Sequence, residues 1–360
     1  MDGACFKNAS EAPDEPLEVT DKEGGRIPLM QTDSVSTPNR GELEYDNDYH
    51  GIGYDASAKD IEALLNRMAE ERLETKRTSQ LNELAQNISY GNIHEGVKMT
   101  VHRMSTIDDK LRDRYDEASP PLLAISKQLQ RSITRQLQDQ RRGGKQTGLY
   151  MGRRLDIHSL PRNDGRVFSK MSLPNETPEL ALALLLDESG SMGCGSRATY
   201  ARASAIILYD FCQSLGIPVM VYGHSAYSGV ELYSYAEFDS IDKLDRYRLM
   251  DISARGNNRD GAALRFVAEQ LAKRPEDIRL LILVSDGQPA DSGYYGTAAE
   301  EDLRGIKTEY RRKGICFVAA AIGDDKDSIE RIYGDAYMDI SDLHTLPIAL
   351  TNAVKRFIRT

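Results

Sequence analysis

The sequence predicts an α/β fold with a doubly wound, mainly parallel sheet over residues 179–360. Leu180–Leu186 is a continuous apolar run, as expected of a strand that is buried on both faces. Further short apolar runs alternate with helical periodicity to the end of the chain, which is the pattern of right-handed crossover units. Ligands bind such sheets beyond the carboxyl ends of the strands, so we expect the functional site in the loops that follow the strands.

The individual elements follow from the same periodicities. After the first strand, we expect strands at 217–222, 230–235, 278–284, 315–322 and 336–340, and helices at 198–215, 260–271, 298–313, 328–333 and 343–358.

Three regions precede this domain. Residues 1–50 carry 12 acidic and 4 basic side chains and few large apolar ones, so we expect them to be mostly disordered. Residues 51–145 form a predicted helical region, with one helix near 57–88 and a basic second helix. The second helix is expected to start at Ser119, with Pro120 and Pro121 in its first turn, and to end at Gly143. Residues 146–178 are expected to be a linker with short extended pieces.

Composition excludes several classes of protein. The apolar runs are shorter than the roughly 18 residues that a membrane span needs, and the first 30 residues show no secretory leader. The four cysteines form no C-x-x-C pair, which argues against zinc ribbons and disulfide frameworks and favours a cytoplasmic location. The basic stretch 122–170 is either a solvated helix face or a partner surface. Nucleic acid is the least favoured partner because no aromatic residues alternate with its basic ones.

Three polar loops fall at the edge where we expect ligands. Asp187-Glu188-Ser189-Gly190-Ser191 follows the first strand, Asp286-Gly287 follows a later one, and 256–261 leads into a helix. Hydroxyl and carboxylate oxygens suit a hard divalent cation such as Mg²⁺, and the absence of nearby His or Cys disfavours zinc. Mg²⁺ prefers six ligands, more than these loops offer, so one position should hold water or a group from a partner.

These motifs resemble a known site. Asp187-x-Ser189-x-Ser191 with Asp286-Gly287 resembles the metal-ion-dependent adhesion site of the von Willebrand factor A (VWA) domain, which has a Rossmann-like fold. The stretch 256–322 resembles a branch of that family that contains the nitric oxide reductase activation protein NorD and the cobaltochelatase subunit CobT.

The resemblance implies a ligand set. Asp187, Ser189, Ser191 and Asp286 match the metal ligands of the family. The family's fifth position is usually Thr, and aligning the following helix start places Asp260 there. Asn258 is the competing choice, since Asp260 is also well suited to cap the helix.

Two further features of these loops have open interpretations. Asp291 either supports the metal site or is a solvated loop acid. The pair Tyr294-Tyr295 either anchors a partner or packs its loop onto the domain.

The resemblance also implies a role in recognition rather than catalysis. The partners it implies are a MoxR-type AAA+ ATPase and a client metalloenzyme that the pair activates or remodels. The alternative is a CobT-like subunit of a cobalt chelatase in cobalamin biosynthesis. The chain itself is not expected to bind ATP through a phosphate loop, because Asp139 and Gln146 occupy positions that such a loop around Lys145 requires to be Gly and Ser or Thr.

Overall fold

The computed structural model describes residues 18–20, 26–28, 58–141, 144–149, 151, 154–162, 166–172, 179–240, 243–287, 289–323, 326–340 and 342–358. The chain divides into two compact units, residues 1–80 and 81–360. The first unit contains β1 (Glu18–Thr20) and β2 (Arg26–Pro28), which pair antiparallel, and most of α1 (Ala58–Gln86), which corresponds to the predicted first helix. Most of residues 1–50, where the sequence predicts disorder, lie outside the described residues.

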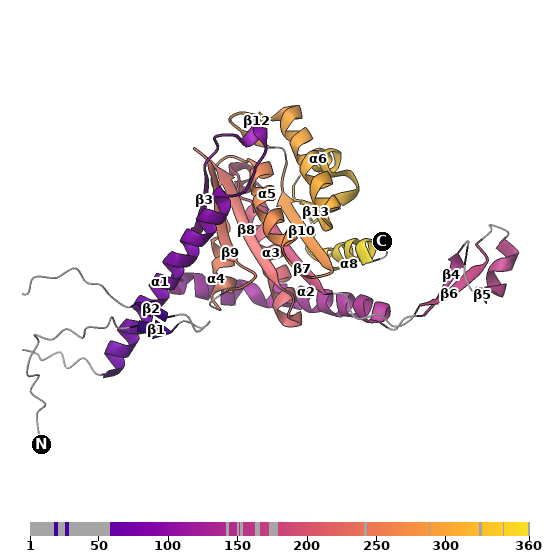
Figure 1. Ribbon diagram of the computed structural model, residues 1–360, viewed down its shortest axis with the longest axis horizontal. Coiled ribbons are helices and arrows are strands. Elements are labelled where there is room, and N and C mark those ends of the chain that lie inside the picture. Colours follow the sequence, from indigo (N-terminus) through magenta and orange to yellow (C-terminus); the bar gives the residue numbers. More distant parts are fainter. Residues whose placement is uncertain are drawn as a thin grey trace, which may run out of the picture. The chain divides into compact units, whose positions relative to one another are not determined.

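The second unit is built on a seven-stranded sheet (Figure 1). Its order is β14 (Tyr337–Asp339), β13 (Ile315–Ala321), β10 (Ile278–Ser285), β7 (Leu180–Asp187), β8 (Val219–Ala226), β9 (Val230–Ala236) and β3 (Met99–Arg103). The first five strands run parallel, whereas β9 is antiparallel to β8 and β3 is parallel to β9. Every residue of β7 is buried, as the continuous apolar run predicts.

Helices cover both faces of this sheet. One face packs against α2 (Asp109–Arg141), α3 (Arg197–Leu215) and α8 (Leu346–Ile358). The other packs against α5 (Asp260–Ala272), α6 (Gly296–Arg312), α7 (Lys326–Tyr333) and the end of α1. The predicted doubly wound, mainly parallel α/β fold is therefore confirmed, and α4 (Asp245–Arg248) is a single extra turn.

The second helix starts earlier than the sequence predicts. The prediction placed its first turn at Ser119, but α2 begins at Asp109 and continues through Pro120 and Pro121. Proline in a helix interior removes a hydrogen bond and crowds the preceding turn. The turns before the prolines carry Tyr115, which is buried in the core, and burial of this aromatic ring offsets the cost.

The predicted helical region and the predicted C-terminal domain share one core. Leu129 and Ile133 of α2 are fully buried in the core between the seven-stranded sheet and the helices that cover it. The edge strand β3, which the sequence did not predict, pairs with β9 from Met99–Arg103. Parts of 51–145 are thus structural elements of the same folded unit as 179–360.

The predicted linker contains paired strands. β4 (Gly144–Leu149), β6 (Phe168–Ser172) and β5 (Arg154–Leu155) form a three-stranded antiparallel sheet. A two-stranded hairpin, β11 (Ala290–Asp291) with β12 (Tyr294–Tyr295), follows β10. Across the described ranges, no helix has the length and apolar character needed to cross a membrane.

Candidate metal centre

The three polar loops meet at the carboxyl edge of the parallel strands. β7 and β10 are neighbours in register, so Asp187 and Asp286, which end and follow them, lie at the same edge. The first loop is joined to the loop before α5, because the Gly190 N–H donates to the Gly256 carbonyl at 2.7 Å. The β11–β12 hairpin joins the same loop through a 3.2 Å bond from the Ala290 N–H to the Asn258 carbonyl.

Four of the predicted ligands form one continuous chain of contacts. The Ser189 and Ser191 hydroxyl oxygens lie 2.9 Å apart, and Ser191 donates to Asp286 Oδ1 at 3.0 Å. The Ser189 backbone N–H donates to Asp187 Oδ1 at 2.8 Å. The structure thus brings together the D-x-S-x-S motif and the later aspartate, which are about a hundred residues apart in the sequence.

Asn258 also reaches this cluster. Its side-chain amide donates to Asp187 Oδ2 at 2.9 Å, while its Oδ1 accepts the Asp260 backbone N–H at 3.2 Å. The Ser285 hydroxyl donates to the same Asp187 oxygen at 3.0 Å. Asp187 therefore accepts hydrogen bonds from three groups, and Asn258, the competing choice for the fifth position, is one of its direct neighbours.

The Asp260 carboxylate has a different neighbour. Its Oδ1 lies 3.1 Å from His224 Nε2, and both side chains are fully buried. Burial lowers the pKa of His224, but the interaction with Asp260 outweighs it and raises the pKa overall. The Asp260 carboxylate thus faces the buried His224 ring, and it is close enough to Asp187 that its charge raises the pKa of Asp187.

The cluster carries excess negative charge. Burial and then the charge of Asp260 raise the pKa of Asp187 above its ordinary value. Burial and the charge of Asp187 likewise raise the pKa of Asp286, although Arg197 donates to its Oδ2 at 2.8 Å and opposes the shift. Two buried carboxylates that disfavour each other's charge are the environment that a bound cation would relieve.

The donor set fits a hard cation. In the part of the chain that the structure describes, no three carboxylate, histidine or cysteine side chains are close enough to hold a metal by themselves. A cation at this edge would therefore need the Ser189 and Ser191 hydroxyls in addition to Asp187 and Asp286. An all-oxygen set that includes neutral ligands suits Mg²⁺ and does not suit zinc.

A second buried acid supports the first loop. Glu188 accepts hydrogen bonds from the Tyr235 hydroxyl and from Arg255 Nε, both at 2.5 Å, and burial raises its pKa to about 7. Gly223 is required beside it, because a Cβ there would lie 2.0 Å from Glu188 Oε1. The Glu188 side chain therefore bonds to Tyr235 and Arg255 rather than to the ligand cluster, and it anchors the first loop to β9 and to the loop before α5.

Arg259 ties the loop before α5 to the β11–β12 hairpin. Its Nε donates to Asp291 Oδ2 at 2.8 Å, and its Nη2 donates to the Ser292 carbonyl at 2.6 Å. Asp291 is thus a partner of Arg259 that supports the site, and the interpretation as a solvated loop acid is wrong.

The same arginine contacts a segment from the N-terminal part of the unit. Its Nη1 lies 3.4 Å from both the Ile93 carbonyl and His94 Nδ1 in η1 (Asn92–His94), the short purple helix beside β12 in Figure 1. The His94 ring packs on Tyr294 with centroids 4.7 Å apart. Tyr294 is buried and packs its loop onto the domain, whereas Tyr295 is exposed, so the interpretation as a partner anchor stays a prediction for Tyr295 alone.

Sequence reasoning missed Ser285, Arg197 and Arg259. Ser285 ends the buried strand β10 and directly precedes the predicted ligand Asp286. A hydroxyl in that position could have been recognised from the sequence. The other two are arginines beside loops, and only the folded structure shows which carboxylate each one contacts.

The comparisons with known proteins agree with this architecture. The family model described as "Cobalamin biosynthesis protein CobT VWA domain" matches residues 246–360. Protein NorD of Brucella melitensis is 27% identical over 172 residues, covering 47% of this chain and 24% of NorD. The uncharacterized protein YojO of Bacillus subtilis is 22% identical over 262 residues, covering 68% of this chain and 40% of that protein. The chain thus spans less than half the length of these curated relatives.

Solved structures with similar folds include adhesins. The vWF domain of the type V pili tip protein Mfa5 from Porphyromonas gingivalis has a TM-score of 0.39 and 12% identity, covering 51% of this chain and 97% of that one. The pilus adhesin SpaC from Lactobacillus rhamnosus GG has a TM-score of 0.39 and 16% identity, covering 51% of this chain and 30% of that one.

Proposed function

The chain is a VWA-domain protein that resembles NorD and CobT, and from this premise we propose that it recognises a partner protein through a bound divalent cation. The observation that carries the proposal is the unbroken contact chain through Asp187, Ser189, Ser191 and Asp286. These residues would hold the cation, with Mg²⁺ as the expected ion.

The chemistry of recognition follows from an incomplete donor set. A cation held by two hydroxyls and two carboxylates keeps positions that water or a partner oxygen can fill. A carboxylate from a partner would be attracted by the cation and oriented by it, so charge and geometry must both match. Ser191 is exposed while Asp187 is buried, which leaves the cluster open on the hydroxyl side.

The partners we propose are those that the resemblance implies. A MoxR-type AAA+ ATPase would supply the energy, and this chain would recognise a client metalloenzyme that the pair activates or remodels. The likeness to NorD supports this version. The match to the CobT VWA domain supports the alternative, a subunit of a cobalt chelatase that itself performs no chemistry. The cytoplasmic location remains a prediction from cysteine usage.

Calorimetric titration with Mg²⁺, together with thermal unfolding, tests the metal site. We expect Mg²⁺ to bind the wild-type chain and raise its melting temperature, because a ligand of the folded state stabilises it by mass action, by about 2.7 kcal/mol at a hundredfold excess over the dissociation constant. Asp187→Ala should abolish both effects. Ser191 is an exposed residue whose hydroxyl contacts only Ser189 and Asp286 of the cluster, so Ser191→Ala should keep the fold and weaken binding about tenfold.

Asp335→Ala is the matched control, since it removes a 59% exposed aspartate that pairs with Lys307 and Arg311 on a charged surface. It should bind Mg²⁺ as the wild type does. The proposal fails if Asp187→Ala binds Mg²⁺ normally, or if capture of a purified MoxR-type ATPase or client is unchanged by both this substitution and EDTA. Asn258→Ala and Asp260→Ala then show which of the two residues serves the fifth position.

A further inference from the structure

Three exposed tyrosines stand at the edge of the sheet that holds the candidate metal centre. Tyr227 is 88% exposed, Tyr295 is 69% exposed and Tyr200 is 38% exposed. Among the side chains that the structure describes, these are the exposed large aromatic residues; the other exposed large apolar residues are aliphatic. An exposed tyrosine offers a large contact area at a low cost in conformational entropy, which is why tyrosines are enriched at protein interfaces.

Short backbone connections tie two of these rings to the metal loops. Tyr227 follows Ala226, which exchanges backbone hydrogen bonds of 2.8 and 2.7 Å with Asn257 in the loop before α5. Tyr200 lies in the first turn of α3, directly after the D-x-S-x-S loop, and its N–H donates to the Ser196 carbonyl at 3.1 Å.

The third ring is carried by the hairpin after β10. Tyr295 pairs with Ala290 across the β11–β12 hairpin, and the Ala290 N–H donates to the Asn258 carbonyl. Asn258 in turn contacts Asp187. The three tyrosines are therefore connected to the ligand cluster through different elements: the first turn of α3, the turn after β8 and the strand β12. We call Tyr200, Tyr227 and Tyr295 the tyrosine rim.

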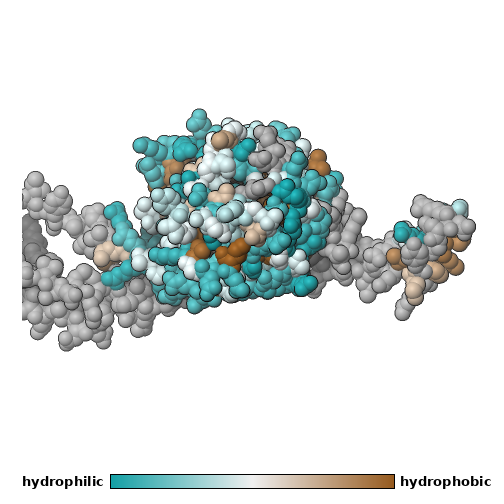
Figure 2. Space-filling model, turned by 90° about the horizontal axis from the view of Figure 1, so that it is seen from above, coloured by the Kyte–Doolittle hydropathy of each residue, from teal (hydrophilic) through white to brown (hydrophobic). Residues whose placement is uncertain are grey.

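The surface between these rings carries almost no charge. Segments 190–200, 226–229, 256–258 and 289–298 contain two charged residues, Arg197 and Asp291. Arg197 pairs with Asp286 and Asp291 pairs with Arg259, each at 2.8 Å. The remaining residues are mostly Gly, Ser, Ala, Tyr, Thr and Asn. Figure 2 views the molecule from the end at which β12 lies in Figure 1 and shows pale, weakly polar atoms over its middle.

This composition identifies the kind of partner. Tyr, Ser, Gly and Asn are the residues that antibody paratopes use, with tyrosines as rigid anchors and small polar residues as adaptable contacts. A nucleic acid would require Lys or Arg for its phosphates, and in these segments the one cation is already paired with Asp286. Within these four segments, charged side chains of a partner would meet only Arg197 and Asp291, which are already paired with Asp286 and Arg259.

We propose that the tyrosine rim is a docking surface for a polypeptide segment that presents one carboxylate to the metal, flanked on both sides by uncharged, apolar residues or proline. This inference rests on the proposed function and specifies the partner segment that the site selects. The central carboxylate completes the coordination of the cation, and the flanking residues pack on the rings of Tyr227, Tyr295 and Tyr200.

Selection from a displayed library of random dodecapeptides tests the proposal. The full chain is immobilised with Mg²⁺, and the most enriched peptide is synthesised with a fluorophore for anisotropy measurements. We expect enriched peptides to contain one Asp or Glu between apolar or proline residues. Tyr227→Ser and Tyr295→Ser should each lower the affinity about tenfold, as expected for aromatic anchors. Replacing the apolar flanks of the peptide with lysine should lower it as well.

Ile348→Ser is the matched control, because it removes a side chain that is 67% exposed on α8. It should leave peptide affinity unchanged. The proposal is overturned if no peptide is enriched, if the enriched peptides carry charged flanks, or if the tyrosine variants bind as the wild type does.

EDTA separates this inference from the proposed function. If EDTA abolishes binding but the tyrosine variants bind normally, metal-dependent recognition stands and the tyrosine rim is wrong. If the tyrosine variants lose affinity but EDTA has no effect, the rings contact the peptide, but the metal-bridged function and the carboxylate-to-metal contact of this inference are both wrong.

Discussion

Two polar regions of the molecule differ in how exposed their charged side chains are. One is the loop end of the sheet, formed by the loops after β7 and β10 and the loop before α5, and the other is the flank formed by α6 and α7. On the flank, charges are dense and partly exposed, and they pair with each other. Lys307 and Arg311 both reach Asp335, at 3.1 and 2.9 Å, and Arg304 reaches Glu300 at 3.0 Å. At the loop end, the charged side chains are buried and the exposed ones are neutral.

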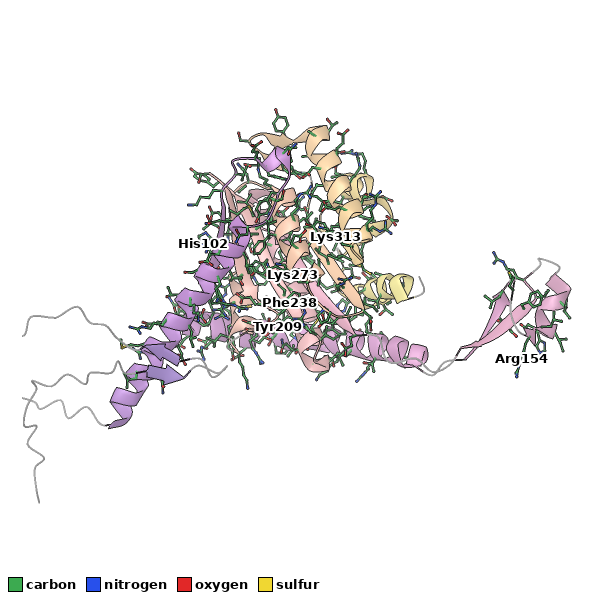
Figure 3. The ribbon with its side chains drawn as sticks, viewed as in Figure 1. His102, Arg154, Tyr209, Phe238, Lys273 and Lys313 are labelled. Carbon is green, nitrogen blue, oxygen red and sulfur yellow. The ribbon has the colours of Figure 1, made fainter. Side chains whose placement is uncertain are left out.

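Charged residues that line a pocket beside this flank also pair with each other. The pocket has a volume of about 470 Å³ beside α5 and α6, at whose C-terminal ends Lys273 and Lys313 lie (Figure 3). Lys313 pairs with Glu269 at 2.7 Å and with Glu309 at 3.0 Å. Lys313 and Arg265, two cations of this pocket, therefore already have anionic neighbours.

The two regions therefore differ in how they hold charge, and the site that we propose lies in the region with fewer charges. The flank has many charges, and most of those described above are paired with each other. The loop end has few, but Asp187, Glu188 and Arg259 are removed from water and each is held by specific donors or acceptors. Burying a charge is costly, so a cluster of buried, hydrogen-bonded charges beneath a neutral surface indicates a built site.

Substitution of Arg259 should have the largest effect on stability. Its side chain is 6% exposed, and Arg259→Ala would leave the Asp291 carboxylate without its cation and separate the hairpin from the loop before α5. Removing one member of a buried pair costs about 3–5 kcal/mol. Urea denaturation measures the loss.

Arg304→Ala is the matched control on the flank, where the arginine is 42% exposed and pairs with Glu300. Because Arg304 is partly exposed and Glu300 keeps Arg331 as a second cation, the loss should be less than about 1 kcal/mol. Equal losses from the two substitutions would show that the two regions do not differ in how they hold charge.

Much of the fold could be predicted from periodicity alone. The buried strands β7, β10 and β13 read as apolar runs, and the helices between them have clear amphipathic patterns. Their order fixes which loops share an edge, so the convergence of Asp187, Ser191 and Asp286 was predictable as well.

What could not be predicted depends on contacts between distant segments. β3 reads as an ordinary alternating stretch, and only its pairing with β9 makes it part of the sheet. The start of α2 was hidden because prolines usually mark a first turn, whereas here burial of Tyr115 outweighs them. The neighbour of Asp260 could not be predicted either, because His224 lies on β8, far from Asp260 in the sequence.

Substitution of Asp302 should have an intermediate effect on stability, and the size of this effect should depend on pH. Burial raises its pKa, but hydrogen bonds from His94, Tyr294 and Arg265 outweigh burial and lower the pKa below its ordinary value. Its stabilisation is therefore complete above the unfolded pKa of about 3.9 and is lost as the pH falls through the folded value. Asp302→Asn should cost about 2 kcal/mol at pH 7, the range for hydrogen bonds to a charged group.

Urea denaturation at a series of pH values checks the sign. The difference between wild type and Asp302→Asn should be constant from pH 7 to pH 5 and should shrink below about pH 4, as the wild-type carboxylate is protonated. A difference that stays the same down to the lowest pH at which both proteins fold would show that the charge of Asp302 is not what stabilises η1 against α6.

The smallest expected effect belongs to the flank pocket, where Lys313 is 40% exposed. Burial lowers the pKa of this lysine, but its bonds to Glu269 and Glu309 outweigh burial and raise it. Because water and salt screen such a pair, Lys313→Ala should cost less than about 1 kcal/mol at low salt and almost nothing at about 1 M NaCl. Urea denaturation at the two salt concentrations measures both values. A loss comparable to that of Arg259→Ala, or one that persists at high salt, would mean that the flank holds its charges as firmly as the loop end does, and exposure would then not distinguish the two regions.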